Sequence, residues 1–139
     1  MGAFPNVGYT VGVIVAGYPR RLLGMAAATA VTLGVRHIIR VEVRGWSMAP
    51  SLRPGDRMVA VRGLEGRPGD IVAVHDPRVP TRMLVKRVAA VDADHRLFLA
   101  GDAPSASTDS RSFGPVLPSS VAGRVVWRYW PWEDRGPLP

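Results

Sequence analysis

The chain of 139 residues contains no cysteine and only three histidines. The absence of cysteine excludes disulfide bonds, a thiol nucleophile and thiolate metal ligands. The histidines, His37, His75 and His95, are scattered and do not have a metal-ligand spacing. We therefore expect no metal and no other cofactor.

Lysine is almost absent too, because 17 of the 18 basic residues are arginine and the single lysine is Lys86. The apolar run at 83–91 predicts a β-strand in which Leu84, Lys86 and Val88 share one face. An amine among aliphatic groups loses hydration, which lowers its pKa and lets it act as a base near neutral pH. The alternative is an ordinary lysine whose amine reaches solvent from a sheet edge.

Acidic residues are scarce, and the 11 present leave a net charge of +7. Such an excess is typical of nucleic-acid-binding proteins. The arginines are nevertheless dispersed, and no nucleic-acid-binding motif is present. We expect a solvated basic surface with an affinity for anionic lipid, and no nucleic-acid partner.

No apolar run reaches the roughly 20 residues needed to span a bilayer. Residues 22–35 are uncharged and mostly apolar, and residues 7–18 form a second apolar stretch. We expect residues 1–37 to be an N-terminal apolar helical segment, either a membrane anchor or a packed helix. If it spans a membrane, the arginines that follow it favour a cytoplasmic location for the rest of the chain. The protein is thus expected to be membrane-associated or cytoplasmic.

Residues 38–139 indicate one mainly β domain. Thirteen Pro and 15 Gly separate short alternating or apolar runs, at 38–43, 57–62, 70–75, 83–91, 96–100 and 121–129. Arg-Pro-Gly-Asp occurs twice, at 53–56 and 67–70. Both copies suit a β-turn with Pro at its second position and Gly at its third.

A serine follows the first predicted strand at a sharp turn. Ser47 lies in the run GWSMAP at 45–50. Such a loop can expose a hydroxyl and aim successive backbone N–H groups at one point, as an oxyanion hole requires. Serine needs a base to become a nucleophile, and lysine is one of the recognised bases. None of the histidines is placed for that role.

Three blocks occur in order: SMAPSL at 47–52, the strand with Lys86-Arg87, and Gly101-Asp102 followed by STDSRSFG at 107–114. Together they resemble the type I signal peptidases, serine proteases with a Ser-Lys dyad, over about residues 40–130. The resemblance implies a compact catalytic core of short antiparallel strands, with Ser47 as nucleophile and Lys86 as general base. By the same resemblance Ser107 orients the lysine amine, and Asp109 and Arg111 form a structural ion pair.

Two positions depart from the family pattern. Gly45 stands where some members have a serine whose hydroxyl contributes to the oxyanion hole, so the hole must rely here on backbone N–H groups such as that of Ser47. Ala103 replaces the asparagine of the familiar Gly-Asp-Asn. Neither departure removes an atom of the dyad, and both bear on how the substrate fits.

The spacing of the blocks points to a short form of the family. Only 14 residues separate Lys86 from Gly101, where the larger signal peptidases insert a β domain. This compact core, the block at 105–111 and the closing run at 124–131 look like the nickel-type superoxide dismutase maturation proteases. The implied substrate is a nickel superoxide dismutase precursor that loses a short N-terminal extension. The alternative is a general type I signal peptidase that cleaves exported preproteins and associates with a membrane.

Two further alternatives stay open. A self-cleaving repressor-type protease shares the Ser-Lys dyad and cuts its own Ala-Gly bond, and Ala16-Gly17 lies upstream of Ser47. The chain contains three such pairs, however, so this one carries little weight. The other alternative is a non-catalytic β-rich binding module, against which the retained Ser47, Lys86 and Ser107 argue.

Overall fold

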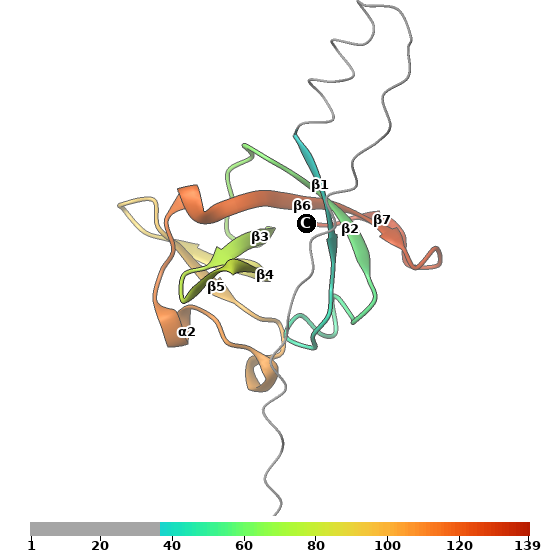
Figure 1. The fold of residues 1–139 in the computed structure, drawn as a ribbon, viewed down its shortest axis with the longest axis horizontal. Coiled ribbons are helices and arrows are strands. Elements are labelled where there is room, and N and C mark those ends of the chain that lie inside the picture. The colour runs from blue at the N-terminus through green and yellow to red at the C-terminus, as the bar shows by residue number, and fades with distance from the viewer. Residues whose placement is uncertain (1–36) are drawn as a thin grey trace, which may run out of the picture.

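The computed structural model describes residues 37–139, which form one seven-stranded antiparallel sheet and three short helical turns (Figure 1). The strands are β1 (Ile38–Glu42), β2 (Arg57–Val61), β3 (Ile71–Asp76), β4 (Val79–Val91), β5 (Leu97–Ala100), β6 (Val121–Trp130) and β7 (Gly136–Pro137). The turns are η1 (Pro104–Ala106), α2 (Ser110–Phe113) and η2 (Pro118–Ser120).

The predicted mainly β fold is confirmed, because each predicted run contains or overlaps one of these strands. The predicted apolar helical segment lies outside the described residues, apart from its last position, His37. Within residues 37–139, no helix is long and apolar enough to cross a membrane.

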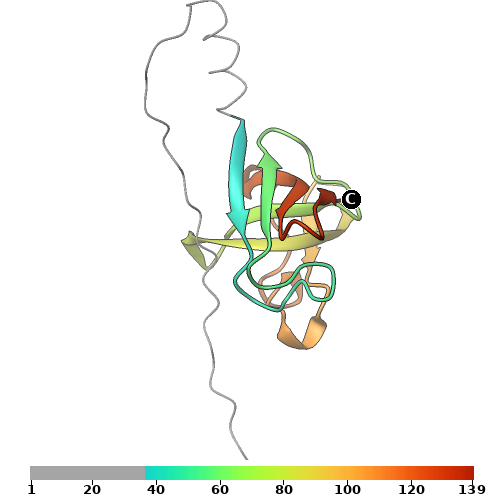
Figure 2. The same cartoon turned by 90° about the vertical axis from the view of Figure 1, so that its right-hand side faces the viewer.

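The sheet does not follow the order of the chain. Its strands are arranged β1-β2-β6-β3-β4-β5, and β7 pairs with β6. The late strand β6 therefore lies between β2 and β3. A register shift interrupts its pairing with each of these two strands. Such bulges bend and twist a sheet, and Figure 2 shows β1 and β2 running across the direction of β4.

The two Arg-Pro-Gly-Asp segments form the predicted turns. Gly55 and Gly69 have φ values of 93° and 96°, a region that glycine enters without steric cost. In the copies at 53–56 and 67–70, the Asp N–H donates to the Arg carbonyl at 3.0 and 2.9 Å. Each Asp carboxylate also accepts the Arg N–H, at 3.1 and 2.9 Å. The turns are thus closed twice, which fixes the entry into β2 and β3.

Strand β3 is buried on both faces. Ile71 and Ala73 belong to one apolar cluster, whereas Val72 and Val74 belong to a second. The neighbouring β4 divides in the same way, with its odd-numbered Met83 and Val85 in the first cluster. A polar side chain at an even position in the middle of β4 therefore enters the second cluster.

Candidate active site

Lys86 occupies such a position in β4, and only 3% of its surface is exposed. It pairs with Val72 of β3 and shares a strand face with Leu84 and Val88, which belong to the second cluster. Since β4 lies between β3 and β5, the alternative of an amine that reaches solvent from a sheet edge is wrong. Burial lowers the pKa of Lys86 from 10.5 to about 8, and the nearby Asp109 carboxylate opposes this shift.

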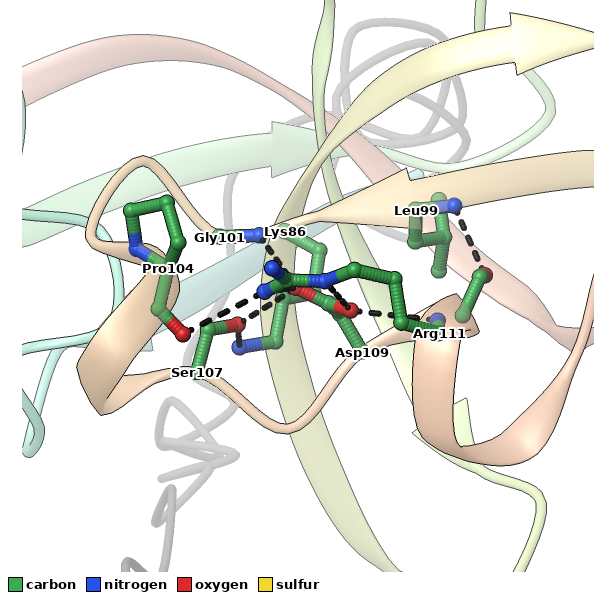
Figure 3. Close-up of polar contacts among 8 residues, drawn as sticks. Lys86, Leu99, Gly101, Pro104, Ser107, Asp109 and Arg111 are labelled. Atoms are coloured by element: carbon green, nitrogen blue, oxygen red, sulfur yellow. Dashed lines mark hydrogen bonds and ion pairs between the residues drawn. The ribbon is translucent and has the colours of Figure 1, made fainter.

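A chain of hydrogen bonds holds the amine. Lys86 Nζ donates to Ser107 Oγ at 2.8 Å, and Ser107 Oγ donates to Asp109 Oδ2 at 2.9 Å (Figure 3). The backbone N–H of Gly101 donates to the same carboxylate oxygen at 3.1 Å. Because the Ser107 proton points to Asp109, the hydroxyl oxygen presents its lone pairs to the amine. Ser107 thus fixes the direction of Lys86 Nζ.

Asp109 is fully charged in this arrangement although its side chain is buried. Arg111 Nε and Nη2 each donate to it at 2.8 Å, and the Arg111 backbone N–H donates at 3.2 Å. These bonds, foremost those of the guanidinium, hold the pKa of Asp109 far below its usual range. Asp109 is also the N-cap of α2, so one carboxylate anchors the helix, the arginine and Ser107.

The Ser47 loop is anchored by apolar side chains and meets the Ser107 loop at a glycine. Met48 and Leu52 are buried in the first cluster, and the Ser47 carbonyl accepts the Ala103 N–H at 3.0 Å. A Cβ on Gly101 would lie 2.5 Å from Ser47 O and 2.2 Å from Ser107 Oγ. Only a residue without a side chain lets the two loops approach this closely.

The structure therefore brings Lys86, Ser107, Asp109 and Arg111 into one bonded group, with the Ser47 backbone beside it. Among the described residues, the hydrogen bond of the amine goes to Ser107 and not to Ser47. Catalytic hydrogen bonds are often long without substrate and tighten in the complex, so this geometry is compatible with a dyad.

The oxyanion hole expected around Ser47 has a free donor. The N–H of Ser47 donates to no acceptor within residues 37–139. Gly45 lies two residues earlier in the same half-buried loop and brings no side-chain donor. The backbone N–H of Ser47 is therefore available for a developing negative charge.

A second network, which sequence reasoning missed, ties the same segments together. Arg87 donates to both carboxylate oxygens of Asp102, at 2.8 and 2.7 Å, and to Ser51 Oγ at 3.4 Å. Arg87 lowers the pKa of Asp102, which stays ionised. Arg87 follows Lys86 in β4, Asp102 follows Gly101, and Ser51 belongs to the Ser47 loop. In the sequence, the only sign of this network was that its charged residues lie next to the motif residues.

Two further features of residues 37–139 concern possible ligands. No three His, Asp or Glu side chains among them gather into a group that could hold a metal. A cavity of about 440 Å³ lies at residues 63–66 and the β4–β5 hairpin, and none of the candidate site residues lines it.

Comparison of the sequence with known proteins shows the family of this chain. Residues 20–95 and 93–130 match the family model of signal peptidase, peptidase S26. The chain belongs to the peptidase S26 family. One relative is mitochondrial ATP-independent inner membrane protease subunit 1b of Arabidopsis thaliana, with 34% identity over 120 residues. That alignment covers 68% of this chain and 71% of the relative. Another relative is mitochondrial inner membrane protease subunit 2 of Mus musculus, with 31% identity over 134 residues. That alignment covers 78% of this chain and 77% of the relative.

Membership of this family confirms the resemblance to signal peptidases and implies a serine endopeptidase. The narrower expectation of a nickel superoxide dismutase maturation protease gains no support, because the relatives just described are named as inner membrane protease subunits. The alternative of a signal-peptidase type enzyme fits the comparisons better.

Proposed function

We propose that this protein is a signal-peptidase-like serine endopeptidase that removes N-terminal extensions from precursor proteins, with Ser47 as nucleophile and Lys86 as general base. The observation that carries the proposal is the single buried lysine, whose amine is held by Ser107 beside the backbone of the Ser47 loop. Burial in an apolar cluster destabilises the charged ammonium form of an amine. It therefore favours the neutral form, which a general base needs in order to accept a proton near neutral pH.

In the proposed reaction, neutral Lys86 accepts the Ser47 Oγ proton as the oxygen attacks the scissile carbonyl carbon. The Ser47 N–H stabilises the resulting oxyanion. The lysine ammonium then gives the proton to the leaving amine, the C–N bond breaks, and an acyl-enzyme remains. In the second step Lys86 deprotonates a water molecule, which attacks the ester carbon. The ester C–O bond then breaks, and the lysine ammonium returns the proton to Ser47 Oγ, which restores both residues. Ser107 and Asp109 keep the amine in place through both steps.

The favoured substrates are precursors delivered at a membrane, since the relatives are named for an inner membrane. Membrane association of this chain also has local support, because Trp46, Trp127, Trp130 and Trp132 are exposed. Tryptophan prefers the membrane–water interface, and the net charge of +7 favours anionic lipid. Sedimentation of the purified protein with anionic vesicles, but not with neutral ones, would support this part of the proposal; absence of binding to either would contradict it.

A cleavage assay tests the proposed function. Wild-type protein, Ser47→Ala and the control Ser119→Ala, an exposed serine of η2, are incubated alone, with a signal-peptide-bearing preprotein, and with a nickel superoxide dismutase precursor. We expect wild type and Ser119→Ala to cleave a precursor and Ser47→Ala to fold but not cleave.

Each alternative gives a different result in the same assay. Cleavage of the nickel superoxide dismutase precursor alone would restore the narrower substrate assignment. Fragments from protein incubated without substrate would indicate self-cleavage. A wild type without activity on any precursor would favour a binding module, and cleavage by Ser47→Ala would overturn the assignment of the nucleophile.

A further inference from the structure

Another buried carboxylate lies at the end of β3, outside the residues that the proposed reaction uses. Asp76 is completely buried. It accepts from Arg78 Nε at 3.1 Å and Nη2 at 3.0 Å, from the Arg78 backbone N–H at 2.9 Å and from Arg82 Nε at 2.8 Å. Arg82 Nη2 forms a further ion pair with the same carboxylate. One negative charge thus meets two guanidinium groups, and the three residues, here called the Asp76 cluster, carry a net charge of +1.

The Asp76 cluster contacts both elements that build the site. The Arg78 guanidinium lies over the Phe113 ring at 5.3 Å, and Phe113 is the last residue of α2, the helix capped by Asp109. Arg82 lies on β4 four residues before Lys86, at the register shift of the β3–β4 pairing, which falls between Val79 and Met83 on β4. Four residues of extended chain put the two Cα atoms at most about 14 Å apart.

Two carboxylates near Lys86 are each balanced by one arginine. Asp109 is paired with Arg111, and Asp102 is paired with Arg87. The Asp76 cluster differs from these two pairs, because it keeps a surplus of positive charge. Burial is the main cause of the low pKa of Lys86, and Arg111, Arg78 and Arg82 lower it further, against the opposing effect of Asp109.

We propose that Asp76, Arg78 and Arg82 are positioning residues for Lys86: the surplus charge of the Asp76 cluster opposes protonation of Nζ, and the Arg78–Phe113 contact holds α2 against the β3–β4 hairpin. The consequence for catalysis rests on the proposed function, because it requires that Lys86 is the base. The electrostatic effect on Lys86 does not, and it can be measured without any substrate.

The sign of the effect separates an electrostatic role from a structural one. Removing one arginine makes the cluster neutral, which should raise the pKa of Lys86. Removing the Asp76 charge leaves two guanidinium groups and should lower that pKa. A cluster that only supports packing would, when damaged in either way, let water reach the amine and raise the pKa in both variants.

The experiment uses the fact that Lys86 is the single lysine of the chain. Lysine labelled with ¹³C at Cε gives one side-chain NMR signal, whose titration reports the Lys86 pKa directly. We expect Arg82→Gln to raise the pKa by a few tenths of a unit up to about one unit, as a charge at this distance predicts. Arg82→Glu should raise it about twice as far, and Asp76→Asn should lower it. The control Arg96→Gln, which removes an arginine from the β4–β5 hairpin, should leave it unchanged.

Equal shifts in Arg82→Gln and Arg82→Glu, no shift in either, or an upward shift in Asp76→Asn would overturn the inference. If Asp76→Asn does not fold, the graded response of the two Arg82 variants still decides. The pH profile of cleavage then tests the link to catalysis: the acidic limb should move with the NMR pKa, and Arg82→Gln should regain the wild-type rate at high pH. An NMR shift without movement of that limb would instead contradict the role of Lys86 as the base and leave the electrostatic inference standing.

Discussion

Replacement of Lys86 by methionine should remove activity and at the same time stabilise the protein. Methionine has a similar length and no charge, so it fills the space of Lys86 in the second apolar cluster. The folded protein then no longer has to hold a protonated amine away from water. The gain follows from the pKa of Lys86, which falls from 10.5 to about 8 on folding.

The magnitude and its pH dependence can be worked out from this shift. A lysine with a depressed pKa binds fewer protons in the folded state than in the unfolded state, so its burial costs stability below the folded pKa. The difference of about 2.5 units corresponds to about 3 kcal/mol at pH 7. The cost shrinks between pH 8 and 10.5 and is nearly gone above that range. Loss of the bond to Ser107 offsets about 1 kcal/mol of the gain.

Urea unfolding of wild type and Lys86→Met between pH 7 and 10 measures this effect. We expect the variant to be more stable by about 2–3 kcal/mol at pH 7, with the difference falling steadily as the pH rises. A variant that is less stable than wild type at pH 7, or a difference that does not change with pH, would refute the reasoning that Lys86 is held in a desolvated site.

Two other substitutions probe the groups around the amine. Ser107→Ala should fold and retain cleavage above the level of Ser47→Ala, but about 10²–10⁴-fold below wild type, because positioned proton transfer contributes about that factor; an unchanged rate would mean that Ser107 does not orient Lys86. Gly101→Ala should lose activity and about 1–3 kcal/mol of stability, because its Cβ would overlap Ser107 Oγ and Ser47 O. Gly136→Ala, whose Cβ would meet no atom within 4 Å, is the control, and equal effects of the two substitutions on cleavage would contradict the account.

The local part of this structure could be predicted from the sequence. The apolar run at 83–91 located most of β4, and the face of Lys86 followed because side chains in a strand point alternately to opposite sides. The Arg-Pro-Gly-Asp turns were predictable as well, since each residue type suits one position of such a turn.

The long-range part could not be predicted from alternation alone. Nothing in the pattern around β6 indicates that it lies between β2 and β3. The short apolar run of β3 did not by itself show a strand buried on both faces, because such a run also fits a buried helix segment. The Asp76 cluster and the pair of Arg87 with Asp102 depend on this pairing, because their partners come together only after the strands are arranged in space. For Ser107, Asp109 and Arg111 the signal was family resemblance, not spacing.

The measurement that tests the central claim most directly is the cleavage rate of Lys86→Arg across pH. Arginine keeps the positive charge but stays protonated, so it cannot accept the Ser47 proton. The account predicts a folded Lys86→Arg protein, checked by circular dichroism, that is as inactive as Ser47→Ala and Lys86→Ala at every pH. Wild-type cleavage should rise with pH through about 8, where the neutral amine becomes populated. A folded Lys86→Arg protein that cleaves precursor at near wild-type rates would contradict the claim that Lys86 is the general base.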